Sequence, residues 1–159
     1  AYWESLRAND VLIVDGWSTA YYENFTVGSG GSGDKPLVVS YTSSPPADVI
    51  FASDGRTEPA SVNVSPDNGT FRQIEFVGII EGTQQRKLAE AWVDYMLDLP
   101  FQNDIPLQMF VYPVNKLATL PQEFVDYTQS PQNPASMLSE TIDTRREQWI
   151  QDWTDTVIK

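Results

Sequence analysis

The chain contains neither histidine nor cysteine among its 159 residues. Without histidine, Ser-His-Asp and Cys-His catalysis, a histidine general base and every metal site that relies on imidazole are excluded. Without cysteine, disulfides, thiolate nucleophiles, iron–sulfur clusters and thiolate zinc sites are excluded. We therefore expect a protein that is not an enzyme, with no catalytic residues, no cofactor and no metal site.

Basic residues are scarce, since 10 lysines and arginines stand against 22 aspartates and glutamates and give a formal net charge of −12. Binding to phosphate backbones needs clustered cations, so we expect no nucleic-acid partner. The same charge favours a cationic ligand. No apolar run approaches the roughly 20 residues that span a bilayer. The chain opens on Ala1, Tyr2 and Trp3 rather than on methionine, which predicts a fragment of a longer parent protein.

Continuous apolar runs alternate with amphipathic segments along the chain. Runs of this kind predict buried strands at three main places: 11–14, 37–39 and 71–80. The amphipathic spacing predicts helices at 2–8, at 17–25, between Thr83 and Pro100, around Phe124, and from about Ser139 onward. Strands alternating with helices in this way predict an α/β fold with a mainly parallel sheet covered by helices.

Glycine and proline mark the breaks between these elements. The glycine-rich stretch 28–33 predicts a flexible surface loop. Pro100 is expected to end the preceding helix, and residues 101–105 to form a turn.

Four aromatic residues stand at such breaks rather than within a periodic stripe: Trp17, Tyr41, Phe110 and Tyr112. Exposed rings can stack on a planar ligand and attract a cation through their faces. The alternative is that they are ordinary core or hinge residues. Tyr21 and Tyr22 could supply two phenolates to a ferric ion, but adjacent helical residues point in different directions, which favours one of them in the core.

Several strings, in order, resemble one family, the thiamine-binding extracellular solute-binding proteins of bacterial ABC transporters. The strings extend over nearly the whole chain: Gly16-Trp17-Ser18, the run from Leu37 to Pro45, Arg72-Gln73-Ile74-Glu75, the run from Phe101 to Pro106, Tyr112-Pro113-Val114, and Arg146, Trp149, Ile150 and Trp153. The match is to the C-terminal half of such a protein.

The resemblance implies part of a two-lobed periplasmic-binding-protein fold of type II. Residues 1–72 would belong to the second lobe, residues 73–135 would return to the first lobe, and residues 136–159 would form a C-terminal helix on the second lobe. Strands missing from both lobes would leave exposed sheet edges, so the fragment could dimerise.

The same resemblance implies a site. Trp17 and Tyr41 correspond to family aromatics that line the thiamine site, and Phe110 stands where the family often has tryptophan. Tyr112 joins them as a candidate aromatic residue, and Ser18, Ser43 and Ser44 are candidate hydrogen-bond donors to a hydroxyethyl or phosphate group.

The implied function is capture of thiamine or its phosphates for an ABC transporter, with the membrane permease as partner. The location would be periplasmic or extracellular, or a membrane-anchored lipoprotein in a Gram-positive organism. The alternative within the same superfamily is a ferric-ion or other small-solute binding protein. Ferric relatives usually carry an adjacent tyrosine pair after the strand where this chain has only Tyr41.

Overall fold

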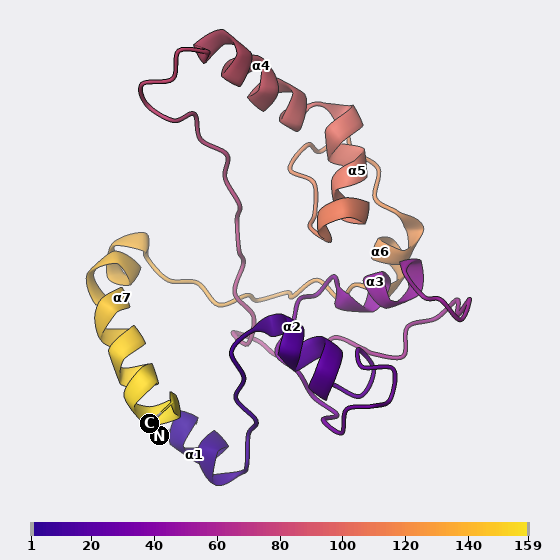
Figure 1. The fold of residues 1–159 in the computed structure, drawn as a ribbon, viewed down its shortest axis with the longest axis vertical. Coiled ribbons are helices and arrows are strands. Elements are labelled where there is room, and N and C mark those ends of the chain that lie inside the picture. Colours follow the sequence, from indigo (N-terminus) through magenta and orange to yellow (C-terminus); the bar gives the residue numbers. More distant parts are fainter. Residues whose placement is uncertain (1, 159) are drawn as a thin grey trace. The chain divides into compact units, whose positions relative to one another are not determined.

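A computed structural model describes residues 2–158, and within them the regular structure is helical (Figure 1). The α-helices are α1 Tyr2–Ala8, α2 Trp17–Thr19, α3 Ser44–Ile50, α4 Arg86–Leu97, α5 Leu99–Met109, α6 Gln122–Tyr127 and α7 Ser139–Trp153. Two π-helical segments follow α2 and α7: η1 Ala20–Asn24 and η2 Thr154–Ile158.

The predicted α/β fold with a mainly parallel sheet is wrong, because residues 2–158 contain no strand and no sheet. Phe25 and Lys35 form an isolated parallel bridge. Each of the three runs predicted as strands is irregular, and large side chains within them face solvent: Val11, Leu12, Leu37, Val39, Phe76 and Ile80. A strand is stable only beside a partner strand. With no sheet among the described residues, the predicted sheet edges are absent too.

The prediction made for Pro100 was wrong. Pro100 does not end α4, which stops at Leu97; it lies in the first turn of α5, where its missing N–H costs nothing. The predicted turn at 101–105 is therefore helical. In the same way, α3 begins at Ser44 and places Pro45 and Pro46 in its first turn, where both are buried.

The chain divides into two compact units, each described by itself. Unit 1 combines Ala1–Ser40 with Pro134–Lys159, and unit 2 is Tyr41–Asn133. No helix among residues 2–158 is long and apolar enough to cross a bilayer.

In unit 1, α1 packs against the π-helical segment η2 near the C-terminus (Figure 1). The guanidinium of Arg7 donates a hydrogen bond of 2.7 Å to the carbonyl of Val157, whose side chain is buried. The rings of Trp3 and Trp153 meet edge to face at 6.4 Å. The predicted helices at 2–8 and from about Ser139 are confirmed.

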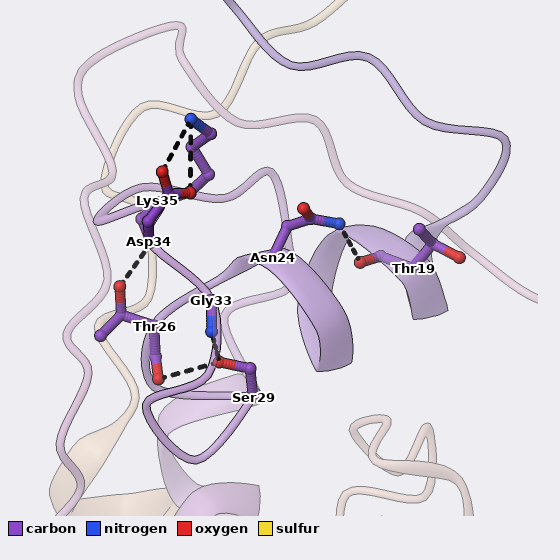
Figure 2. A network of polar contacts seen from close by, with 7 residues as sticks. All are labelled: Thr19, Asn24, Thr26, Ser29, Gly33, Asp34 and Lys35. Carbon is purple, nitrogen blue, oxygen red and sulfur yellow. Dashed lines mark hydrogen bonds and ion pairs between the residues drawn. The ribbon is translucent and has the colours of Figure 1, made fainter.

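The glycine-rich stretch 28–33 is hydrogen-bonded rather than linker-like (Figure 2). The hydroxyl of Ser29 accepts the N–H of Gly33 at 2.7 Å and donates to the carbonyl of Thr26 at 3.2 Å. The N–H of Gly31 also reaches the Thr26 carbonyl, at 2.8 Å. A Cβ at residue 33 would collide with the backbone of Asn24, so glycine is needed for this close approach.

Unit 2 holds two helix pairs, α3 with α6 and α4 with α5 (Figure 1). The predicted helix around Phe124 is confirmed as α6, and its phenyl ring is only 2% exposed. The helix predicted between Thr83 and Pro100 is confirmed as α4, although the large apolar side chains of Leu88 and Trp92 on it are exposed.

Candidate functional site

Trp17 begins helix α2 in unit 1, directly after the extended Gly16. Its ring stacks on that of Tyr21 at 4.9 Å with an interplanar angle of 21°, and meets Tyr22 edge to face at 5.4 Å. Its indole N–H donates a hydrogen bond of 3.0 Å to the hydroxyl of Ser40. The indole is half-buried, and its orientation is fixed by the stacked ring of Tyr21 and by the hydrogen bond to Ser40.

The adjacent tyrosines of η1 have different environments. Tyr21 is 4% exposed and Tyr22 is 56% exposed, which confirms that one of the pair is a core residue. Tyr21 also contacts the buried ring of Phe25 at 5.4 Å. Among residues 2–158, no three histidine, cysteine, aspartate or glutamate side chains gather where they could hold a metal ion.

Tyr41, Ser43 and Ser44 lie at the start of α3 in unit 2. The N–H of Ser44 donates to the Tyr41 carbonyl at 3.0 Å, and the Ser43 carbonyl accepts the N–H of Ala47 at 3.2 Å. These bonds turn the chain into the helix and leave the Tyr41 ring 55% exposed. Ser43 is buried and Ser44 half-buried, whereas Ser18 on α2 of unit 1 is exposed.

Phe110 follows the last residue of α5 and adopts the left-handed conformation, with φ 57° and ψ 29°. Such a conformation is uncommon for a residue with a side chain, and it ends the helix in the way a glycine often does. The Phe110 ring meets Phe51 edge to face at 5.1 Å. Tyr112 meets the buried Phe124 in the same manner at 5.7 Å.

Three of the candidate aromatics are thus carried by neighbouring elements of unit 2. Tyr41 precedes α3, and Phe110 contacts Phe51, the residue that ends α3. Helix α3 packs on α6, which supplies the Phe124 ring to Tyr112. Trp17 and Ser18 belong to unit 1. The helix pair α3–α6 is therefore the scaffold that unit 2 provides for Tyr41, Phe110 and Tyr112.

Sequence reasoning missed the residues that support these rings. Phe51 and Phe124 stand behind Phe110 and Tyr112, and Ser40 holds Trp17. No local pattern identifies such partners, because each contact joins residues at least 12 positions apart, with the longest joining residues 51 and 110. The buried Gln102 is a fourth case, and it lies within a string that resembles the family.

A surface ion pair lies a few residues after α3 in the sequence. Arg56 contacts the carboxylate of Asp54 at 2.7 Å. The hydrogen bonds from Arg56 lower the pKa of Asp54 to about 2, because they stabilise the charged carboxylate. A shallow hollow elsewhere in unit 2, lined by Asp94, Tyr95, Leu97 and Asp98, contains none of the predicted site residues.

Comparison with known proteins gives a consistent set of relatives. The chain is 33% identical over 158 residues to the thiamine-binding periplasmic protein of Salmonella typhimurium, and 31% identical over 158 residues to that of Escherichia coli. Both alignments cover 98% of this chain and 44% of the relative. The thiamine-binding periplasmic protein of Brucella suis is 25% identical over 154 residues.

The chain therefore spans less than half the length of the curated relatives that it matches. The resemblance identified from the residue strings is confirmed, since similarity to thiamine-binding periplasmic proteins runs through almost the whole chain. No protein-family model matches the chain. No solved structure matches it either.

Proposed function

We propose that the chain is part of the solute-binding component of an ABC importer, a protein that captures thiamine or one of its phosphates and performs no chemical reaction. The observation that carries this proposal is the similarity to thiamine-binding periplasmic proteins over 98% of the chain. We place the protein in the periplasm on the same ground, or outside the cell as a lipoprotein in a Gram-positive organism.

The aromatic residues of unit 2 supply the chemistry that thiamine needs. Thiamine joins a flat pyrimidine to a thiazolium ring with a permanent positive charge, and both stack favourably on aromatic faces. Tyr41 is 55% exposed, and Phe110 and Tyr112 are each 39% exposed. In Phe110 and Tyr112 one part of the ring is held by a neighbouring phenylalanine, so each can present its remaining surface without rearranging.

Trp17 is a further proposed stacking residue, with its ring oriented by Tyr21 and Ser40. The serines Ser18, Ser43 and Ser44 would donate hydrogen bonds to the hydroxyethyl or phosphate group of the ligand. A net charge of −12 attracts the cationic thiazolium over a distance set by the ionic strength.

In the longer protein, residues 1–72 and 136–159 would belong to one lobe and residues 73–135 to the other, with the ligand between them. Closure of the lobes would create the surface that the membrane permease recognises. The chain on its own would associate with itself, because large apolar side chains such as Leu37, Val39 and Phe76 are exposed.

Calorimetric titration of thiamine and its mono- and diphosphate tests the proposal, in this chain and in a chain extended to the length of the relatives. Tyr41→Ala is expected to weaken binding about tenfold, because it removes a stacking face worth roughly 1–2 kcal/mol toward a cation. Tyr41→Phe, which keeps the ring, is expected to bind within a factor of about three.

Tyr95→Ala is the matched control, since Tyr95 is 48% exposed in the same unit and is not a candidate ligand residue. It is expected to leave thiamine affinity unchanged. Absence of thiamine binding in both chains contradicts the proposal. Binding of ferric ion in place of thiamine would favour the alternative ligand instead.

A further inference from the structure

Gln102 of α5 is a buried polar side chain of unit 2 whose amide makes three hydrogen bonds. It is only 4% exposed. Its Nε2 donates a hydrogen bond of 2.7 Å to the carbonyl of Met96 in α4. Its Oε1 accepts the N–H of Val114 at 2.8 Å and the N–H of Asn115 at 3.1 Å. One buried amide thus joins α4, α5 and the irregular segment that follows α5.

Two further side chains hold the same segment. The Nδ2 of Asn115 donates to the carbonyl of Leu97 at 2.9 Å, and the Oδ1 of Asn103 accepts the N–H of Thr119 at 2.9 Å. Both of these bonds lie at the surface, where water competes with them. The bonds of Gln102 are partly buried, so water competes with them less and they hold the segment more strongly than the two surface bonds do.

The fixed segment carries two of the candidate binding residues. Tyr112 lies two residues before Val114, and Phe110 ends α5 in a left-handed conformation. Both rings contact phenylalanines of other elements, Phe51 and Phe124. The position of each ring therefore depends on how this segment is held against α4 and α5.

We propose that Gln102 is a positioning residue, which acts on the ligand through the Phe110–Tyr112 segment without touching the ligand itself. The proposal rests on the proposed function for its ligand, thiamine. Glutamine is required because only a side-chain amide of this length offers a donor to the Met96 carbonyl and an acceptor to two backbone N–H groups at once.

Three variants separate these roles. Gln102→Met keeps the length and removes both the donor and the acceptor. Gln102→Glu keeps the acceptor for Val114 and Asn115 and loses the donor in its ionised form. Gln108→Met is the matched control, because Gln108 is an exposed glutamine on the same helix whose amide reaches only the surface carboxylate of Asp104, at 3.3 Å.

The first measurement is amide hydrogen exchange by NMR in the chain without ligand. Gln102→Met is expected to speed exchange at Val114 and Asn115 at least tenfold, whereas Gln102→Glu and Gln108→Met leave it within about threefold. If Gln102→Met fails to fold, Gln102→Asn replaces it, because its amide is one methylene too short to reach both N–H groups. Unchanged exchange in these variants overturns the positioning role.

The second measurement is thiamine affinity. Combining each Gln102 variant with Tyr112→Ala tests whether Gln102 acts on the ligand through Tyr112. Gln102→Met is expected to weaken binding about tenfold, Gln102→Glu to restore most of it, and Gln102→Met to add little once Tyr112 is already alanine. Additive losses overturn the route through Tyr112. If the variants show the expected exchange pattern but the unaltered chain binds no thiamine in either length, the proposed function fails, and the ligand role of Gln102 fails with it. The exchange result then still shows that Gln102 holds the segment at Val114 and Asn115.

Discussion

Two irregular segments of unit 2 have similar apolar content but differ in how they are held in place. They are residues 71–80 and residues 110–119. In the first, Phe76 is 89% exposed and Ile80 is 82% exposed. In the second, Val114 and Asn115 give their N–H groups to the buried amide of Gln102. The apolar content of a segment therefore does not decide whether it is held in place.

Polar anchors and ring contacts make the difference. The second segment places Tyr112 against Phe124, a fully covered ring, and pairs the N–H groups of Val114 and Asn115 with the buried side-chain amide of Gln102 in α5. A buried N–H must be paired, so such bonds specify one arrangement of the segment. Apolar contact alone is non-directional and permits many arrangements. The comparison can be tested by altering one residue of each kind.

The largest effect is expected from removal of the buried ring. Phe124→Ala should lower the free energy of unfolding by about 3–5 kcal/mol, because it removes a covered side chain and leaves a cavity under Tyr112. Phe76→Ala changes the same residue type at an 89% exposed position and should cost less than about 0.5 kcal/mol. Urea unfolding followed by circular dichroism measures both. Equal losses would mean that the Phe124 ring, against which the second segment packs, contributes no more to stability than the exposed Phe76 of the first segment.

A smaller effect is expected in the glycine-rich loop of unit 1. Gly33→Ala should destabilise the chain by about 1–3 kcal/mol, since the added Cβ meets the backbone of Asn24. Gly16→Ala, whose Cβ would have no heavy atom within 4 Å, should cost less than about 0.5 kcal/mol. Thermal unfolding of the pair compares them. A neutral Gly33→Ala would support the flexible surface loop that the glycine content predicts.

Local sequence signals were sufficient for several helices. The helices at α1, α6 and α7 follow from spacing that repeats within a few residues, so their existence was predicted correctly. Helix α3 and part of α5 were not predicted. Pro100 was interpreted as the end of a helix, although proline is compatible with the first turn of a helix, where Pro45 and Pro46 of α3 also lie.

The same local signals wrongly predicted strands at three runs, because a strand exists only with a partner that the local pattern does not name. The candidate site shows the same limit. The aromatic residues were recognised from their place beside breaks and from the resemblance, and their role stays a prediction. Their supports, Phe51, Phe124 and Gln102, are defined by contacts with residues distant in the sequence.

The smallest effect is expected at the exposed pair of Asp54 and Arg56, which is anchored at the surface rather than in the interior. Arg56→Gln should return the pKa of Asp54 from about 2 toward its ordinary value of 3.8, because the hydrogen bonds from the guanidinium are lost. The pKa of Asp54 is lower in the folded chain than in the unfolded chain, so the pair stabilises the folded chain at pH values above 3.8. This contribution disappears as the pH falls toward 2.

NMR titration of the Asp54 carboxyl carbon measures the pKa shift, with Arg145→Gln in unit 1 as a charge-matched control. Water screens this pair, so its loss should leave unfolding at neutral pH almost unchanged. A midpoint near 3.8 in the unaltered chain would show that the pair does not form in solution, and a large loss of stability would show that a surface contact can anchor a segment as firmly as the buried amide of Gln102.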